Sequence, residues 1–331
     1  MPRSERLSVW MVRGLLALLL LLAVEILFWN KPGSRSLYEW PLLIVGYMLL
    51  ATVALDLLVR YRIRDIWGVM IVVGVLSALN GLFLNPQSAL EDVPNTLLSR
   101  TLGGYWLISL EMVGLFLALL GGKSTLHKVL MLLGSVVIGF FWAVWVKWYP
   151  AFFLGAYRAA TIQEMFQTLA WVVLPIIILW MLVRGRTQTL TPEHFQVPWL
   201  GYAVIGLLAM LLFIYHALQN DYDGLGIALS LIIVGVLWAM LWFRADTQKT
   251  SLLATYLAEK SPSPLWLIAS LALFVAVTIG GYVLALIEVL GFNQFTLLNL
   301  AFPLFGAGWI PLVAAVIGIH AMTRQMRLRG F

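Results

Sequence analysis

Ten long apolar runs fill most of this 331-residue sequence, and they restrict the folds open to it more than any other feature. Each run is close to the ~20 residues that an α-helix needs to cross the hydrocarbon core of a bilayer. The sequence therefore predicts an all-α, polytopic integral membrane protein, with about ten transmembrane helices in a single membrane domain over residues 1–331. The runs cover approximately residues 8–29, 40–59, 66–84, 101–120, 126–146, 162–183, 198–218, 224–243, 264–290 and 296–321.

Composition agrees with this class. The chain is 62% hydrophobic and 11% charged, whereas a soluble domain carries roughly a quarter charged residues. Its fifteen tryptophans are typical of the aromatic belts at the two membrane surfaces. The first run lacks a small-residue cleavage site and continues through Phe28 and Trp29, so we expect an uncleaved first helix rather than a signal peptide.

The basic residues predict the orientation of the chain. If the N-terminus is cytoplasmic, sixteen of the 21 Lys and Arg residues fall on the cytoplasmic side and five on the other, which is the bias of known membrane proteins. We therefore expect both termini in the cytoplasm and the chain in the plasma (cytoplasmic) membrane. The net charge of +6 lies in short loops between apolar spans, so it predicts a lipid bilayer as partner and no nucleic acid.

The connecting loops are too short to fold as separate domains. The outer loop 85–100 has turn residues at both ends, and we expect it to hold one short surface helix. The aromatic-rich segment 142–157 is a candidate contact for a protein partner or a pigment.

An acid in the middle of the fourth span is the first candidate for function. Glu111 lies within Thr101–Gly122, beside a helical stripe of small residues that includes Gly114, Ala118 and Gly122. Such a stripe lets helices approach closely, so we expect Glu111 to face other helices. A charged group at a helix centre costs about 2.5–3.5 kcal/mol. Two interpretations remain open, a proton-coupling or cation-binding acid and a protonated acid that serves packing.

For the other acids of the spans we expect simpler roles. Glu288 ends the ninth span near the outer boundary, after a ladder of small residues at Ala272, Ala276 and Gly280. Glu25 and Asp56 lie within a turn or two of span ends, where snorkelling or solvation suffices.

Uncharged polar groups gather at the outer ends of several spans, and they line an outward-open cavity if they converge. They are Asn80, Asn85, His216, Gln219 and Asn299. The candidates for substrate binding or coupling are Glu111, Glu288, Asn80, His216 and Asn299.

The tenth span contains Pro303, Gly306, Gly308 and Pro311. Proline removes a backbone hydrogen bond and clashes with the preceding turn, so we expect a kink or a short unwound segment there. Breaks of this kind are tolerated at membrane depth where they are buried in protein or line water, as at transport sites.

Several chemistries have no support in the sequence. Cysteine is absent, the four histidines lie in separate segments, and no phosphate-binding or nucleophile-elbow motif occurs. We therefore predict no catalytic residues, no metal and no cofactor. The Asp221-Tyr222-Asp223-Gly224 sequence is an acid pair, but it occupies a short turn between two spans, where a polar turn is the expectation.

Trp40-Pro41 with Gly46-Tyr47 in the second span is similar to Pro198-Trp199 with Gly201-Tyr202 in the seventh. This pairing raises the hypothesis of two inverted five-helix halves, residues 1–150 and 161–331. In helix count, orientation and size the whole chain resembles the drug/metabolite transporters of the five-plus-five inverted type. That resemblance implies a carrier of small molecules.

Three functions stay open. The first is a secondary transporter or permease for a small molecule, with Glu111 as the coupling or cation-binding group. The second is a non-catalytic subunit of a larger membrane complex, with other membrane proteins as partners. The third is an integral-membrane enzyme acting on a lipid or isoprenoid through acids at the outer face.

Overall fold

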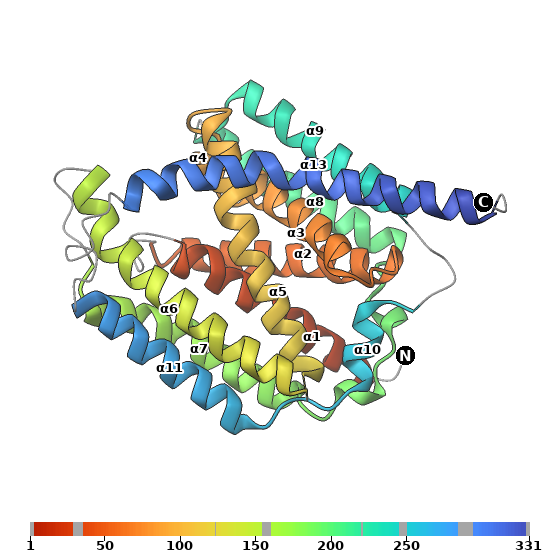
Figure 1. Cartoon of the computed structure of the whole chain (residues 1–331), viewed down its shortest axis with the longest axis horizontal. Helices are drawn as coiled ribbons and strands as arrows, with labels where there is room; N and C mark the ends of the chain where they lie inside the picture. The colour runs from red at the N-terminus through yellow and green to blue at the C-terminus, as the bar shows by residue number, and fades with distance from the viewer. Residues whose placement is uncertain are drawn as a thin grey trace. The chain divides into compact units, whose positions relative to one another are not determined.

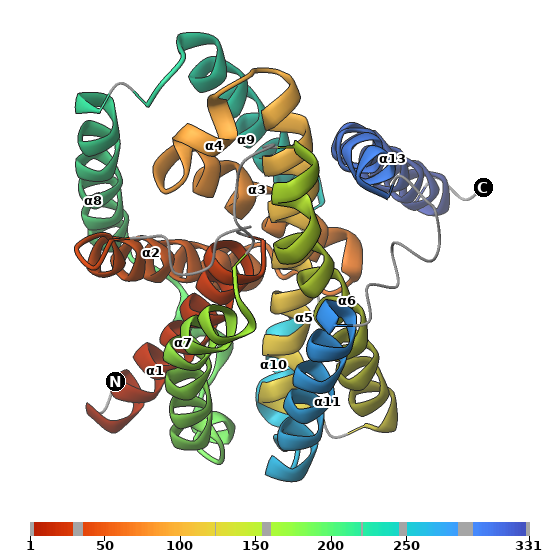
Figure 2. The same cartoon turned by 90° about the vertical axis from the view of Figure 1, so that its left-hand side faces the viewer.

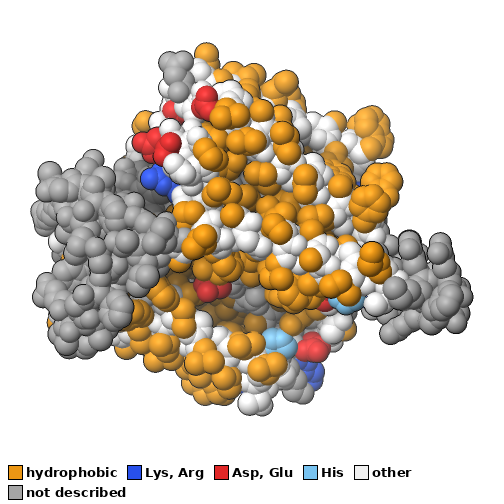
Figure 3. All heavy atoms as spheres, turned by 45° about the horizontal axis from the view of Figure 1, so that its top comes forward, with side chains coloured by type: hydrophobic (Ala, Val, Ile, Leu, Met, Phe, Trp, Pro, Cys, Tyr) orange, Lys and Arg blue, Asp and Glu red, His pale blue; other side chains and the backbone are white. Residues whose placement is uncertain are grey.

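A computed structural model describes residues 3–28, 36–122, 124–153, 160–219, 221–244, 250–283 and 294–328. The regular structure of these residues is entirely helical, and ten helical segments are long and apolar enough to cross a membrane. The predicted all-helical class and the count of ten spans are therefore confirmed for the described chain. Hydrophobic side chains cover most of the described surface in view, and charged ones are few (Figure 3).

The long helices follow the predicted spans closely (Figure 1). They are α1 (Arg3–Leu21), α2 (Glu39–Arg60), α3 (Ile66–Phe83), α5 (Trp106–Gly121), α6 (Thr125–Phe153), α7 (Ile162–Val183), α8 (Trp199–Leu218), α9 (Gly224–Arg244), α11 (Pro264–Val283) and α13 (Gln294–Leu328).

Shorter elements complete or connect these helices. Two π-helices extend α1 and precede α5, and short α- and 3₁₀-helices lie in the loops. They are η1 (Leu22–Leu27), α4 (Pro86–Leu90), η2 (Leu97–Tyr105), η3 (Thr187–Thr189), η4 (Pro192–Phe195) and α10 (Leu252–Ala258). The short helix expected in the outer loop is α4, although its Ala89 and Leu90 are buried rather than on the surface.

The chain forms two compact units that alternate along the sequence. Unit 1 comprises Met1–Ala51, Glu111–His194 and Ala254–Leu298, and unit 2 comprises Thr52–Leu110, Phe195–Leu253 and Asn299–Phe331. Because the boundaries fall inside helices, α2, α5, α10 and α13 each contribute residues to both units.

In unit 1, α7 packs against α1 and η1, and α11 packs along α6 (Figures 1 and 2). The α6–α11 contact is close because Gly139 leaves room for the main chain of Phe274, whose carbonyl oxygen lies 2.8 Å from an ideal Cβ on that glycine. On α11 the buried face is formed by Ser270, Phe274, Thr278 and Gly281. The predicted ladder of Ala272, Ala276 and Gly280 is wrong as a packing face, since both alanines are exposed and open space surrounds Gly280.

The small-residue stripe of α5 is also displaced from its predicted position. Gly114 is exposed, and nothing lies within 4 Å of an ideal Cβ on it. The close approach occurs at Gly121, where the main chain of Tyr256 in α10 occupies the space of a Cβ. The prediction that Gly114 brings two helices together is therefore wrong. The packing glycine of this helix is at its end.

In unit 2, α3 lies at the centre and contacts α4, η2, α8 and α9. Its Gly74 faces Trp309 of α13 and Leu237 of α9. The Trp309 ring stacks on Trp106 with 4.6 Å between centroids, and the Trp106 indole donates to the carbonyl of Met70 at 2.9 Å. At Gly74, the missing side chain on α3 therefore leaves room for the ring of Trp309.

The tenth span is an uninterrupted helix, so the expected unwound segment is not present. Helical structure continues through Pro303 and Pro311 within α13. Gly306 of α13 serves close packing instead, because the carbonyl oxygen of Leu98 in η2 occupies the space that a Cβ on Gly306 would need. Gly103 of η2 likewise leaves room for the main chain of α13. The carbonyl oxygen of Phe302 lies 2.6 Å from an ideal Cβ on Gly103.

In each of the two π-helices, a backbone carbonyl accepts a hydrogen bond from a tryptophan indole. A π-turn shifts the backbone hydrogen-bond register and releases carbonyls that need another donor. At η1 the carbonyl of Ile26 accepts from the Trp142 indole at 3.0 Å, and at η2 the carbonyl of Leu102 accepts from the Trp309 indole at 3.0 Å. Trp106, Trp142, Trp180 and Trp309 are all buried. These four rings therefore pack against protein, and the interfacial belts stay a prediction.

Candidate functional site

Glu111 lies near the middle of the span Leu97–Gly121, at the point where α5 enters unit 1. It is partly exposed, and one turn further along α5 the exposed Gly114 leaves the neighbouring surface open. Within the described part of the chain, no hydrogen bond or ion pair reaches its carboxylate. An acid in this setting can exchange a proton or bind a cation without first breaking a bond to the protein.

Glu25 is a buried acid, and the expectation that it snorkels or is solvated at a span end is wrong. Its side chain is 1% exposed, within the π-helix η1. The Tyr47 hydroxyl of α2 donates to Glu25 Oε1 at 2.8 Å. Since these two residues are 22 positions apart, no local spacing reveals the pair.

Asp56 is likewise fully buried, which corrects the same expectation for this residue. Its carboxylate accepts from Arg60 Nε at 2.8 Å and Arg60 Nη2 at 3.0 Å, from the Val197 backbone N–H at 2.7 Å, and from the Tyr202 hydroxyl. Arg60 also donates to the carbonyl of Val197 at 2.8 Å. This network fixes the end of α2 to the segment that leads into α8. The four-residue spacing of Asp56 and Arg60 is the one signal of it in the sequence.

Three of the predicted outer polar residues belong to hydrogen-bonded pairs in unit 2. The Asn85 amide, at the N-cap of α4, donates to Asn80 Oδ1 at 3.0 Å, and both side chains are buried. His216 Nδ1 lies 2.8 Å from Asp221 Oδ2, and Gln87 of α4 donates to Asp221 Oδ1 at 2.8 Å. The short helix α4 is thereby joined to the α8–α9 turn.

Tyr222, in the turn between α8 and α9, also contacts α3. Its hydroxyl donates to the carbonyl of Leu82 at 2.7 Å, and its ring stacks on Phe213 with 4.5 Å between centroids. Burial, reinforced by the nearby negative charge of Asp221, raises the pKa of Tyr222. The phenol therefore stays protonated at physiological pH, as its donor role requires. Asp223 accepts from the Gly226 backbone N–H at 3.1 Å, so this acid caps α9.

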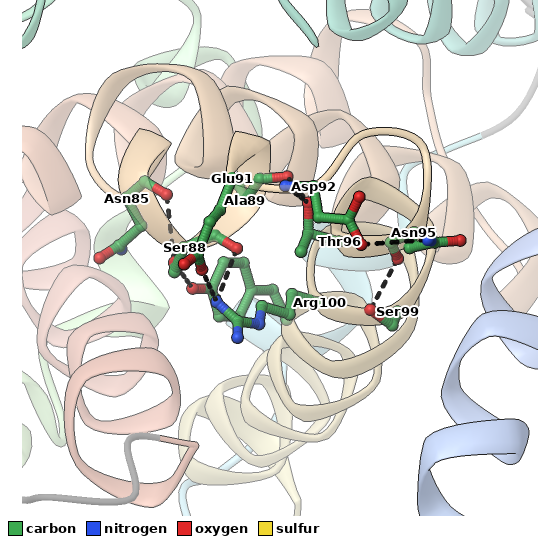
Figure 4. Close-up of polar contacts among 10 residues, drawn as sticks. Asn85, Ser88, Ala89, Glu91, Asp92, Asn95, Thr96, Ser99 and Arg100 are labelled. Atoms are coloured by element: carbon green, nitrogen blue, oxygen red, sulfur yellow. Dashed lines mark hydrogen bonds and ion pairs between the residues drawn. The ribbon is translucent and has the colours of Figure 1, made fainter. Parts of the chain in front are cut away.

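The outer loop between α3 and α5 is internally hydrogen-bonded (Figure 4). Arg100 donates to the carbonyl of Ser88 at 2.9 Å and lies 3.4 Å from Glu91. Thr96 donates to the carbonyl of Ala89 at 2.9 Å, and Asn95 donates to Asp92 at 3.1 Å. These contacts connect α4 with η2 and with the turn between them.

Of the three other predicted residues, two have side chains outside the described part of the chain and the third is exposed. Glu288 lies outside the described residues, and so does the side chain of Asn299, whose backbone is in α13. Gln219 ends α8 as its C-cap and is exposed. The described histidines lie in separate places, and no group of three or more His, Asp or Glu side chains in the described ranges is placed to hold a metal ion.

Ten apolar helices and the absence of any strand from the described residues define a polytopic, all-helical membrane protein. No known protein family, curated protein or solved structure matches this chain.

Proposed function

We propose that this protein is a secondary transporter for a small molecule in the plasma membrane, with both termini in the cytoplasm and Glu111 as its coupling or cation-binding group. One observation carries the proposal, namely that the Glu111 carboxylate lies at mid-span on a helix surface left open by Gly114.

The cost of an intramembrane carboxylate is the reason to assign it a task. About 2.5–3.5 kcal/mol is spent to hold a charged side chain at the centre of a span. Glu25 and Asp56 offset that cost with protein hydrogen bonds. Glu111 has no such bond in the described part of the chain, so packing specificity accounts less well for it than proton or cation binding does.

The test is uptake by the purified protein in liposomes under an imposed pH gradient. Isotopically labelled small metabolites serve as candidate substrates, and accumulated compounds are identified by mass spectrometry. We expect accumulation of at least one compound that depends on the gradient. Glu111→Gln should abolish the dependence, because the amide keeps the shape of the side chain but carries no titratable proton.

A matched control is Glu91→Gln, since Glu91 is an exposed acid of the outer loop. This variant should transport as the wild type does. Gradient-dependent accumulation that persists in Glu111→Gln would refute the role of Glu111. A complete lack of accumulation together with co-purification of a stoichiometric membrane-protein partner would replace the transporter with the non-catalytic subunit.

A further inference from the structure

Three hydroxyl groups inside unit 2 lack a hydrogen-bond partner among the described residues. They belong to Ser77 of α3, Thr101 of η2 and Ser230 of α9, and each residue is at most 1% exposed. Buried side-chain hydroxyls in native proteins nearly always have a partner, because leaving one unpaired costs free energy. Three orphaned hydroxyls on three adjacent helices therefore require an explanation outside the protein's own groups.

Helix packing brings these hydroxyls to within about one helical turn of the same depth. The helices α3 and α9 run antiparallel, since Asp65 at the start of α3 pairs with Arg244 at the end of α9. Gly74 of α3 meets Leu237 of α9, whose Cδ1 lies 3.0 Å from an ideal Cβ on the glycine. Seven residues are about two helical turns. Two turns outward from this contact, Gly81 on α3 therefore lies at the level of Ser230 on α9.

Thr101 approaches the same glycine from η2. Its Oγ1 lies 2.9 Å from an ideal Cβ on Gly81. Ser77 precedes Gly81 by four residues, so it lies one turn away on the same side of α3. Thr101 and Ser230 thus lie at the level of Gly81, the position where α3 has no side chain, and Ser77 lies one turn away on α3. The π-helical geometry of η2 around Thr101 is of the kind that recurs at functional sites.

The chemistry of this donor set selects the ligand. Neutral oxygens suit hard cations, whereas a divalent ion normally requires carboxylates. The three residues supply hydroxyl oxygens alone, and the buried Asn80, next to Gly81, brings an amide oxygen to the same depth. We propose that Ser77, Thr101 and Ser230 form a binding site for a monovalent cation, Na⁺, in the outer half of unit 2. This site is additional to Glu111 and does not depend on the proposed transport function.

Direct binding of ²²Na⁺ to the purified full-length protein in detergent tests the site. We expect saturable binding, and a thermal unfolding midpoint that rises with NaCl at constant ionic strength set by choline chloride. Thr101→Val and Ser230→Ala should each weaken ²²Na⁺ binding at least tenfold. The matched control is Ser270→Ala, which removes a fourth unpartnered buried hydroxyl from α11 in unit 1 and should leave binding unchanged.

The wild-type measurement decides the matter even if a variant fails to fold. The absence of saturable ²²Na⁺ binding to folded wild-type protein, with equal unfolding midpoints in NaCl and choline chloride, would overturn the proposal and leave the hydroxyls to ordered water. Undiminished binding in folded Thr101→Val would overturn it as well. Glu111→Gln should bind ²²Na⁺ as the wild type does, so loss of proton coupling and loss of this site are separate results.

Discussion

Asp56 holds four hydrogen bonds inside the membrane region, and its partners come from two distant parts of the chain. Arg60 neutralises the charge from one turn away, while Val197 and Tyr202 bring the loop before α8 to the same carboxylate. The exposed side of the Arg60 guanidinium reaches solvent. These hydrogen bonds offset part of the cost of burying the Asp56 carboxylate.

Asp56→Asn should destabilise the protein. The amide retains an acceptor for the Val197 N–H but loses the charge-assisted bonds to Arg60, so we expect the free energy of unfolding to fall by about 1.5–3 kcal/mol. Thermal and denaturant unfolding of the purified protein measure the change. Arg62→Gln is the control, because Arg62 is an exposed residue of the adjoining turn. Equal stability of Asp56→Asn and wild type would contradict the structural role of this network.

The depth of these acids was predictable only in part from sequence. Asp56 and Arg60 are spaced to pair on one helix, but Tyr202 is 146 residues from Asp56 and Tyr47 is 22 residues from Glu25. Proximity to the end of an apolar run predicts solvation, and the tertiary partners that bury an acid are not visible in that run. Glu111 has no such partner in the described chain, and its position at mid-span follows from the length of the run alone.

At the scale of elements, glycine decides where helices meet. Main-chain atoms of a neighbouring element occupy the Cβ position of Gly121, Gly103 and Gly306. The same helices carry glycines with open surroundings, such as Gly114 and Gly308. A glycine in a span is therefore a packing residue only where a second backbone comes within reach.

Gly306→Ala should force η2 and α13 apart, because its new Cβ would collide with the carbonyl oxygen of Leu98 and a backbone atom cannot rotate aside. We expect a loss of about 1–3 kcal/mol in the free energy of unfolding. Gly308→Ala, two residues along the same helix, has open space and should be neutral or slightly stabilising. Comparable losses in both variants, measured by thermal unfolding in the same detergent, would show that helix propensity rather than close packing governs this span.

Sequence reasoning predicts the elements better than their contacts. Hydropathy locates each span, because every span is long, apolar and bounded by polar residues. The spacing of small residues predicted the wrong packing faces for α5 and α11. Small residues repeat on more than one face of these helices, and only the position of the neighbouring element selects among the faces. The prolines of the tenth span predict a break. Helical structure in α13 nevertheless continues through Pro303 and Pro311.

For the whole molecule, an even count of ten spans predicts both termini on the same side of the membrane. The distribution of Lys and Arg favours the cytoplasm as that side, and this orientation stays a prediction. The two inverted halves stay a prediction, and so does the carrier function that the resemblance implies.

Because the natural sequence contains no cysteine, labelling of single introduced cysteines tests the topology without reaction at other sites. Asn95→Cys in the outer loop should react with a membrane-impermeant maleimide on intact cells. Gln188→Cys in the loop between α7 and α8 should react only after the cells are permeabilised. Both positions are exposed. The reverse labelling pattern would invert the orientation of the entire chain.

The bond between Asp56 and Tyr202 also has a consequence for biosynthesis. Translation at roughly 5–20 residues per second separates the emergence of two residues 146 positions apart by about 7–30 s. The first four spans, whose most apolar stretches are 67–72% buried in the finished fold, precede later spans that are only 11–33% buried. The early helices therefore leave the ribosome with their partners still unmade. Until the seventh span arrives, Arg60 is the one of these Asp56 partners already present in the growing chain.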